Sequence, residues 1–296
     1  MKKIIIAVAL TIVAICNCAF AMRIKVLNVG QGDATLIQTG EQNILIDTSD
    51  ADERDKLEAE LAKANCATID RLILTHPHAD HIANAAWLIK NYGVSAVYDN
   101  GKPSANRYYA NYLKALSDSG VPRYTLQTGD VLELDGATFT VLASAEGVKS
   151  VNNDSICARL SYGNFAMIFT GDAEADMEDW IFQNYDDLES AVLKAGHHGS
   201  KTSNSLDFVS AVAPQYVIVS AGEPGIRGGN TYGHPHAASL ENFLIAGVEK
   251  AAIYWTYKNG TVTIETDGAA TTVTPELVEV WVDEYLGYRL LIRQIG

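Results

Sequence analysis

The chain has 296 residues, of which 48% are hydrophobic and 20% are charged. This composition excludes a disordered or low-complexity protein, and the length suits one or two globular domains. The 36 acidic residues outnumber the 22 basic residues and leave a net charge of −14. Tight, sequence-independent binding of duplex nucleic acid is therefore disfavoured, because it requires a basic surface.

The first 21 residues have the pattern of a secretory signal peptide. Lys2 and Lys3 precede an apolar run at residues 4–15, and residues 19–21 have the small-x-small pattern of a cleavage site. The run is too short to cross roughly 30 Å of hydrocarbon as a helix. We expect cleavage after Ala21, a secreted, periplasmic or extracellular mature chain without a membrane span, and a net charge lowered from −14 to −16 by the loss of the two lysines.

Two cysteines, Cys66 and Cys157, remain beyond the expected signal peptide. In an oxidising compartment they can form one disulfide, and the equally weighted alternative is a pair of buried thiols. A dense disulfide framework is excluded. The sequence leaves the oligomeric state open.

The part of the chain that follows begins with short β-branched runs separated by glycine-rich turns, which predict strands. Strands are expected at residues 23–29, 34–39, 43–47, 71–75 and 94–98. Helices are expected where apolar residues recur with a helical period or between these strands. They are placed at residues 52–65, 83–92 and 105–119.

The second half starts with strands and then alternates between helices and strands. A hairpin around Asp135-Gly136 is expected within residues 131–142. The further strands are expected at residues 155–162, 165–170, 190–195, 215–220, 250–257 and 261–266. The helices between them are expected at residues 173–184, 206–213 and 237–246. An amphipathic helix, with Leu277, Trp281 and Tyr285 on its apolar side, is expected over residues 275–293.

Antiparallel strands at the front, α/β alternation at the back and helices to cover both halves predict a four-layer αββα sandwich of the α/β class. We place this domain at residues 22–274. Residues 275–296 are expected to form a helical extension packed on it.

Three histidines and an aspartate occur within six residues after the strand expected at 71–75, in the pattern His76-x-His78-x-Asp80-His81. On a turn leaving a strand, His76 and His78 can converge on one cation while Asp80 and His81 reach a second. Imidazole suits Zn²⁺ and its neighbours, and a mixed nitrogen and oxygen set is typical of a catalytic site. The alternative is a solvated loop, but three of the seven histidines lie in these six residues.

Further candidate ligands follow other expected strands or lie in a late loop. These are Asp47, Asp172, His197, His198, His234 and His236. Each aspartate alone is more often a turn or capping residue. Their recurrence at successive strand ends instead indicates side chains gathered at one rim around cations.

These motifs, in this order, resemble those of the metallo-β-lactamase-fold hydrolase superfamily. More narrowly, they are similar to the extracellular C-terminal domain of ComEC-type DNA-uptake proteins and to free-standing secreted relatives. The segments that carry the resemblance are NVGQGDA at 28–34, THPHADHI at 75–82, NNDS at 152–155, TGDAE at 170–174, HHGSK at 197–201 and YGHPH at 232–236. They cover nearly the whole chain after residue 21.

The resemblance implies an αββα fold, two divalent metal ions (Zn²⁺ or Mn²⁺) and hydrolysis, with a phosphodiester as the favoured bond. It makes His76 and His78 ligands of the first metal, Asp80 and His81 ligands of the second, and Asp172 the bridge. One of His197 and His198 supplies the last histidine, and the choice between them stays open. Asp47 would orient the histidine turn by hydrogen bonding, and Asp33 would lie near the same rim.

Two positions depart from the pattern of the family. Before Ser155, where a histidine for the first metal is usual, this chain offers Asn153 with Asn152 and Asp154 as alternatives. An amide oxygen is a harder and weaker donor than imidazole, which favours Mn²⁺ over Zn²⁺ or leaves this site labile. Asn28 stands where the branch commonly has aspartate.

The remaining motif residues suggest roles in catalysis. Asp80 is the natural proton acceptor, and His234 or His236 would donate to the leaving oxygen or hold a phosphoryl oxygen. Ser200 and Lys201 would add to anion binding. His234 has an alternative as part of a helix-entry turn.

The acidic surface favours a small, single-stranded or cell-surface phosphodiester as the substrate, and a nuclease-like activity stays open. Two alternatives are a β-lactam or lactone hydrolase on the same fold, and a non-catalytic DNA-uptake accessory module in which the altered motif at 152–155 has abolished metal binding.

Overall fold

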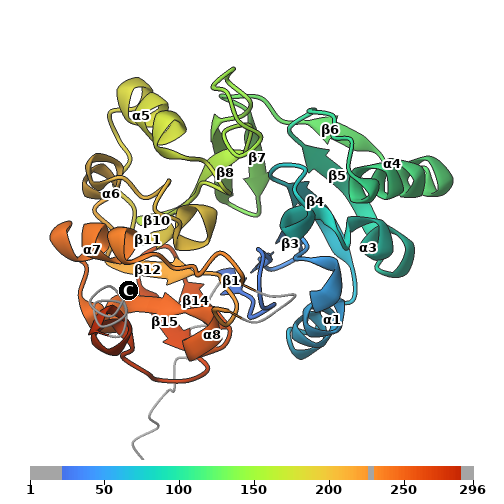
Figure 1. The fold of residues 1–296 in the computed structure, drawn as a ribbon. Coiled ribbons are helices and arrows are strands. Elements are labelled where there is room, and N and C mark those ends of the chain that lie inside the picture. The colour runs from blue at the N-terminus through green and yellow to red at the C-terminus, as the bar shows by residue number, and fades with distance from the viewer. Residues whose placement is uncertain (1–21, 226–229, 288–296) are drawn as a thin grey trace, which may run out of the picture.

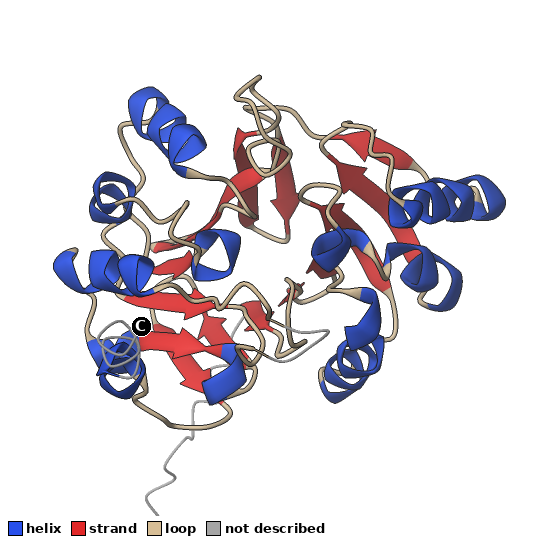
Figure 2. Cartoon of the chain, in the orientation of Figure 1, coloured by secondary structure: helices blue, strands red, loops and turns tan. Residues whose placement is uncertain are grey.

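The computed structural model describes residues 22–225 and 230–287, arranged in four layers (Figure 1). Two β-sheets face one another in the middle, and helices cover the outer face of each (Figure 2). Residues 1–21, where a signal peptide is expected, lie outside the described part of the chain. So do residues 288–296, which include the end of the expected last helix.

The first sheet has eight strands in the order β15-β14-β1-β2-β3-β4-β5-β6. They span Met22–Val26 (β1), Thr35–Gln38 (β2), Asn43–Ile46 (β3), Ile69–Leu74 (β4), Val94–Asp99 (β5), Arg123–Thr125 (β6), Val262–Thr266 (β14) and Thr271–Pro275 (β15). From β3 to β6 the strands are parallel. The outer face is covered by α1 (Arg54–Lys63), α3 (Ala85–Asn91) and α4 (Arg107–Ser119).

The second sheet has seven strands in the order β13-β12-β11-β10-β9-β8-β7. They span Val131–Leu134 (β7), Ala137–Ala143 (β8), Cys157–Tyr162 (β9), Phe165–Phe169 (β10), Val192–Lys194 (β11), Tyr216–Val219 (β12) and Ile253–Trp255 (β13). From β10 to β13 the strands are parallel. The outer face is covered by α5 (Ala175–Asn184), α6 (Leu206–Val212) and α7 (Ala237–Ile245).

Three apolar layers hold the sandwich together. Between the sheets, residues of both pack against each other, as Ile24 and Ile44 do with Phe139 and Met167. Two further layers lie between each sheet and its helices. Each sheet is therefore apolar on both faces, as expected of sheets covered on both sides. The four-layer αββα prediction is confirmed.

The structure differs from the expected elements mainly at the edges of the sheets. Neither β6 nor β15 was expected, because both are short edge strands without a fully buried face. The helix expected from residue 83 is preceded by a separate turn of helix, α2 (Ala79–Ile82). The strand expected at 250–257 is reduced to β13, with a 3₁₀ turn before it and α8 (Thr256–Asn259) after it.

The expected C-terminal helix starts later than the sequence suggests. Pro275 ends β15, and the described helical residues are 282–287. Leu277, placed on the apolar side in the prediction, is 60% exposed, whereas Trp281 is buried against the second sheet and Tyr285 packs beside it. The indole of Trp281 donates to the carbonyl of Ile253, which fixes this end of the chain on β13.

The two cysteines are free thiols, and both are buried. Cys66 lies in the apolar layer beneath α1, and Cys157 lies in the layer on the opposite side of the sandwich. Burial raises the pKa of both thiols, that of Cys66 to about 11. The alternative of two buried thiols is therefore the correct one.

Among residues 22–225 and 230–287, no helix combines the length and the apolar character that a membrane crossing requires.

The turn after β10 depends on a glycine. Gly171 has a φ of +53°, and a Cβ there would lie 2.9 Å from Ser155 Oγ. The Ser155 hydroxyl accepts a hydrogen bond from the N–H of Asp172. The close approach of the β8–β9 connection thus fixes the side chain that follows Gly171.

We expect Gly171→Ala to lower the free energy of unfolding by more than Gly120→Ala, measured by urea denaturation. Gly120 also has a positive φ, of +71°, but a Cβ there would meet nothing within 4 Å. Gly120→Ala should therefore lose only the cost of placing alanine in a left-handed conformation, about 1–2 kcal/mol. The further loss of unfolding free energy in Gly171→Ala measures the contact with Ser155. Equal losses would show that Ser155 moves aside without cost.

Candidate metal centre

All seven histidines of the chain lie at one rim of the sandwich. The rim is formed where parallel strands of both sheets end. His76, His78 and His81 follow β4, and His197 and His198 follow β11. Asp47 and Asp172 follow β3 and β10, and His234 and His236 lie in the loop before α7. Ends of parallel strands are a common place for binding sites because connecting loops from several strands meet there.

His76 and His78 face Asp172 and form the first candidate group. Their ligand atoms lie within 4.8 Å of one another. His76 Nε2 is 3.0 Å from His78 Nδ1 and 3.7 Å from Asp172 Oδ2. Because His76 is buried and lies beside other imidazoles, its pKa is well below the usual range. A neutral imidazole is the form that binds a metal.

Asp80, His81, Asp172 and His198 form the second candidate group, and their ligand atoms also lie within 4.8 Å of one another. His81 Nε2 is 3.2 Å from Asp172 Oδ1, and His198 Nε2 is 3.3 Å from Asp80 Oδ2. Asp172 thus belongs to both groups, with one oxygen toward each. The resemblance predicts a bridging role for Asp172, and this geometry is compatible with it.

Three buried atoms of the second group fit a cation. His81 Nε2, His198 Nε2 and Asp172 Oδ1 have no hydrogen-bond partner within the described parts of the chain. Buried polar atoms without partners are costly, and an ion that all three can reach would satisfy them together. Two imidazole nitrogens with carboxylate oxygens are donors that Zn²⁺ and Mn²⁺ accept.

Asp47 fixes the turn that carries His76, His78 and His81. Its carboxylate contacts His81 Nδ1 at 2.8 Å and accepts hydrogen bonds from the N–H and hydroxyl of Thr75. This leaves His81 Nε2 directed at Asp172. Burial raises the pKa of Asp47 in spite of the opposing charge of His81. The predicted role in orienting the turn agrees with this geometry.

Asp33 plays the equivalent part for His198, together with a lysine that the sequence analysis missed. His198 Nδ1 lies 2.9 Å from the carbonyl of Ser220 and 3.4 Å from Asp33 Oδ1. Lys194, at the end of β11, is buried and forms a 2.9 Å ion pair with Asp33. Burial would raise the pKa of Asp33, but Lys194 and His198 lower it instead. A lysine inside an apolar strand was the signal in the sequence.

The loop after β11 assigns different places to its two histidines. His198 belongs to the second group, while His197 Nε2 lies 3.7 Å from Asp172 Oδ2, the oxygen on the side of the first group. Both residues have a positive φ, of 49° and 56°. Asn204 stabilises this conformation, because its side chain accepts from the N–H of Gly196 and donates to the carbonyl of the same residue.

The segment before Ser155 places Asn152, and not Asn153, at the cavity. Asn153 is buried, and its Oδ1 accepts a hydrogen bond from the N–H of Glu174. Asn152 lines the cavity, and its buried Oδ1 has no hydrogen-bond partner among the described residues. Asp154 lies 4.0 Å from Lys102. Of the three alternatives, Asn152 is the one whose oxygen is available to a ligand.

His234 and His236 lie across the cavity from the histidine turn. Burial and the nearby His198 lower the pKa of His234 to about 3, so its ring is neutral at pH 7. His236 Nδ1 accepts a hydrogen bond from the N–H of Lys201. Ser200 lines the cavity, but the exposed side chain of Lys201 is not among the residues that line it.

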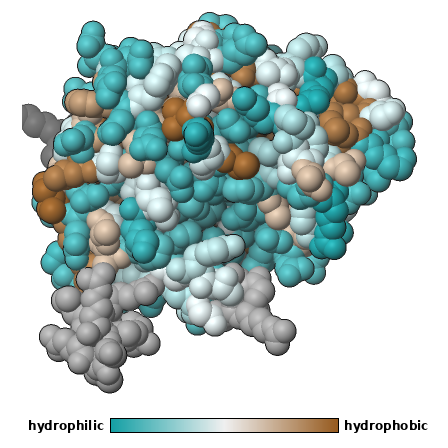
Figure 3. Space-filling model, turned by 45° about the horizontal axis from the view of Figure 1, so that its top comes forward, coloured by the Kyte–Doolittle hydropathy of each residue, from teal (hydrophilic) through white to brown (hydrophobic). Residues whose placement is uncertain are grey.

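The cavity over the two groups has a volume of about 820 Å³. Asp50 and Asp52 lie at its wall, and none of the described residues around it is Lys or Arg. Figure 3 shows a face of the molecule on which hydrophilic residues predominate and hydrophobic ones form separate spots. The cavity has the charge expected of a site that binds cations.

Replacing Asp47 by asparagine should weaken metal binding roughly 10- to 100-fold, because the carboxylate that orients His81 is lost. Competition with a chelator measures the affinity. Asp118→Asn is the matched control, since Asp118 is an exposed residue of α4. Unchanged affinity in Asp47→Asn would contradict the orienting role.

Zn²⁺ binding at pH 7 should release protons. Before a metal binds, burial opposes the charged form of His198, but the negative charges of Asp172 and Asp33 raise its pKa to about 10. A metal must displace that proton, so its apparent affinity should rise as the pH rises from 6 to 9. Calorimetry in buffers of different ionisation enthalpy measures the release, and heats independent of the buffer would contradict it.

Comparisons with known proteins identify the family. The model of the metallo-beta-lactamase superfamily matches residues 27–223. ComE operon protein 3 of Bacillus subtilis is 30% identical over 262 residues, which are 80% of this chain and 33% of that protein. Competence protein ComA of Neisseria gonorrhoeae is 30% identical over 231 residues, 76% of this chain and 30% of that protein. The chain thus spans about a third of the length of these relatives.

Solved structures share the fold at low sequence identity. The metallo-beta-lactamase fold protein YhfI of Bacillus subtilis has a TM-score of 0.54 and 17% identity, covering 82% of this chain and 99% of that one. CmlA, a diiron beta-hydroxylase of Streptomyces venezuelae, has a TM-score of 0.53 and 14% identity, covering 82% and 54%. By the family model and the two competence proteins, the chain belongs to the metallo-β-lactamase superfamily and is similar to its ComEC-type competence proteins.

Proposed function

We propose that this chain is a dinuclear metal-dependent hydrolase that cleaves phosphodiesters. One observation carries the proposal: two groups of ligand atoms meet at Asp172, and three of these buried atoms lack hydrogen-bond partners in the described structure. The metal-dependent hydrolase fold follows from the family. The choice of a phosphodiester rests on the sequence motifs of the ComEC-type branch.

His76, His78 and Asp172 would hold the first metal, with the amide oxygen of Asn152 in place of a third imidazole. The second would be held by Asp80, His81, Asp172 and His198. Because an amide oxygen is a harder donor than imidazole, the first site would accept Mn²⁺ more readily than a site with three histidines.

When bound, two divalent cations would lower the pKa of a bound water and stabilise the negative charge on the phosphoryl oxygens. The protein then has to position the substrate and move protons. Burial opposes the ionised form of Asp80, but its contacts with His198 and His81 lower the pKa of Asp80 below the usual range. Asp80 is therefore ionised at neutral pH and can accept the proton of the attacking water.

The far wall of the cavity supplies donors. Since His236 Nδ1 accepts the N–H of Lys201, His236 Nε2 carries the proton of the neutral ring and can donate to a phosphoryl or leaving oxygen. In the overall step the water oxygen bonds to phosphorus, the bond to the leaving ester oxygen breaks, and that oxygen takes up a proton. Ser200 lies close enough to the rim to help in binding the anion.

The charge of the site favours a small or single-stranded phosphodiester. The cations would attract a single phosphate locally. A duplex needs many basic contacts, whereas Asp50 and Asp52 line this cavity and the chain carries a net charge of −14. Tight binding of duplex nucleic acid is therefore not part of the proposal.

Export through the signal-like segment is the proposed route to a secreted or periplasmic location. Cleavage after Ala21 would leave β1 complete, since it starts at Met22, whose side chain is buried. The similarity to competence protein ComA agrees with a role at the cell surface.

A non-catalytic DNA-uptake accessory module is the second candidate. It is favoured by the ComEC-type relatives and by the absence of a histidine from residues 152–154, where the resemblance predicts a metal ligand. Metal analysis separates the two candidates. The hydrolase should hold close to two equivalents of metal, and metal-free protein that still retards single-stranded DNA would support the module.

Hydrolysis of bis-p-nitrophenyl phosphate should fall roughly 10²- to 10⁴-fold in Asp80→Ala, because a proton acceptor and a metal ligand are lost together. EDTA should abolish it, and added Zn²⁺ or Mn²⁺ should restore it. Asp118→Asn should keep the activity of the unmodified protein. Turnover that survives both treatments would refute the proposal, and faster turnover of nitrocefin would favour a β-lactam hydrolase.

A further inference from the structure

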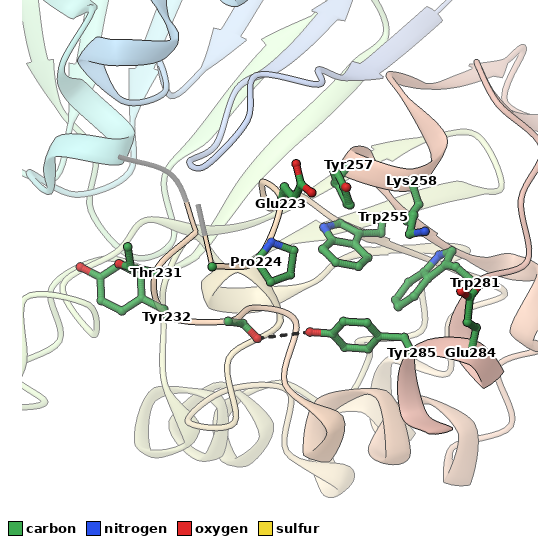
Figure 4. A pocket seen from close by; sticks show the side chains of 12 residues that line it. Glu223, Pro224, Thr231, Tyr232, Trp255, Tyr257, Lys258, Trp281, Glu284 and Tyr285 are labelled. Atoms are coloured by element: carbon green, nitrogen blue, oxygen red, sulfur yellow. Dashed lines mark hydrogen bonds between the residues drawn. The ribbon is translucent and has the colours of Figure 1, made fainter. Parts of the chain in front are cut away.

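A second cavity, of about 590 Å³, lies beside the metal centre, and five of its twelve described lining residues are aromatic. Figure 4 shows the rings of Trp255, Tyr257, Trp281 and Tyr285 gathered at one end of it, with Tyr232 at the other. These residues come from β13, from α8, from the C-terminal helix and the residue before it, and from the loop before α7. The mechanism proposed above uses none of the four gathered rings.

The rings form a continuous aromatic wall. Trp255 lies 5.0 Å from Trp281, 5.2 Å from Tyr257 and 5.2 Å from Tyr285, measured between ring centroids. The indole N–H groups of Trp255 and Trp281 donate to backbone carbonyls. Both indole donors are therefore occupied, and the two tryptophans offer the cavity only ring carbons. Trp255 and Trp281 are 1% exposed and form the floor, while Tyr257 is 37% exposed and forms an accessible side.

Carboxylates complete the lining. Glu223 is hydrogen-bonded to the hydroxyl of Tyr257, and Glu284 lies at the opposite wall. Lys258 is the one cation among the described lining residues; it lies 5.9 Å from the Tyr257 ring centroid and forms a 3.0 Å ion pair with Glu279. Lys258 also interacts with Glu284, but the two carboxylates Glu223 and Glu284 outnumber it among the described lining residues.

Tyr232 connects this cavity to the metal centre. It lines both cavities, as does Thr231. Its ring stacks on His234, with centroids 5.6 Å apart and an angle of 17° between the planes. A ligand that lies over Tyr232 can therefore reach from the metal centre into the aromatic cavity.

We propose that the aromatic cavity binds a quaternary ammonium group carried on one ester arm of the phosphodiester substrate. Aromatic faces with nearby carboxylates attract a bulky organic cation through cation–π and Coulomb interactions. The part of the proposal that concerns the substrate arm rests on the proposed phosphodiesterase function. Binding of the free cation does not.

The lining favours a cation over a nucleobase. A base could stack on the same rings, but a nucleotide chain would bring further phosphates toward Glu223, Glu284, Asp50 and Asp52. A zwitterionic phosphodiester brings a single phosphate to the metals and a positive charge to the carboxylates. Adenosine, which carries a base but no phosphate, therefore serves as the probe for the alternative that the cavity binds a nucleobase.

Calorimetry with tetramethylammonium chloride on the purified full chain tests the cavity. Tyr257→Leu should weaken binding roughly 3- to 30-fold, whereas Tyr257→Phe should keep it, because the ring is retained. Glu284→Gln should weaken binding at least roughly 3-fold. The matched control Asp283→Asn should not, because Asp283 is paired with Lys250 and is not among the lining residues. Absence of binding, binding of adenosine alone, or equal effects of the two Tyr257 variants would overturn the proposal.

The substrate arm is tested with p-nitrophenyl phosphorylcholine and its 3,3-dimethylbutyl isostere, in which carbon replaces the charged nitrogen. The choline ester should have a kcat/KM roughly 3- to 30-fold higher, and Tyr257→Leu should remove this preference. Equal turnover of both esters would overturn the substrate-arm assignment. If neither ester is hydrolysed while tetramethylammonium binds, the proposed function fails and the cation-binding cavity is supported.

Discussion

The burial of Asp172 among imidazoles is the interaction on which the rest of this structure depends. Its carboxylate lies between two groups of ligand atoms, and its neighbours lower its pKa well below the usual range although burial opposes this. A buried charge of this kind is stable only with partners on all sides. The partners come from β4 in one sheet and β11 in the other, so both halves of the sandwich have to be in place.

A second set of contacts ties the halves together just below the rim. Asp33 precedes β2 in the first sheet, and Lys194 ends β11 in the second. The ion pair between them is buried and also supports His198. Breaking one partner of a buried pair is strongly destabilising, because it leaves an uncompensated charge. The same residues therefore serve the stability of the sandwich and the orientation of a candidate ligand.

The sequence was sufficient for the layers and for most of the rim, since the strands are β-branched runs and the ligand candidates follow them directly. It was insufficient where position depends on contacts made by the backbone. The amide oxygen of Asn153 is occupied by the N–H of Glu174, a contact that the sequence does not reveal. The different places of His197 and His198 depend on left-handed backbone angles that Asn204 supports. Lys194 was missed because its partner, Asp33, is 161 positions away.

Burial makes the two thiols, Cys66 and Cys157, unreactive. Cys66 and Cys157 are held in opposite apolar layers, and burial keeps their pKa values high. A thiol with a high pKa and no access to solvent is a poor nucleophile toward disulfides and oxidants. Neither Cys66 nor Cys157 forms a disulfide in the described structure, so neither needs oxidation to reach its place in the fold. These two side chains would therefore stay thiols in a reducing and in an oxidising compartment alike.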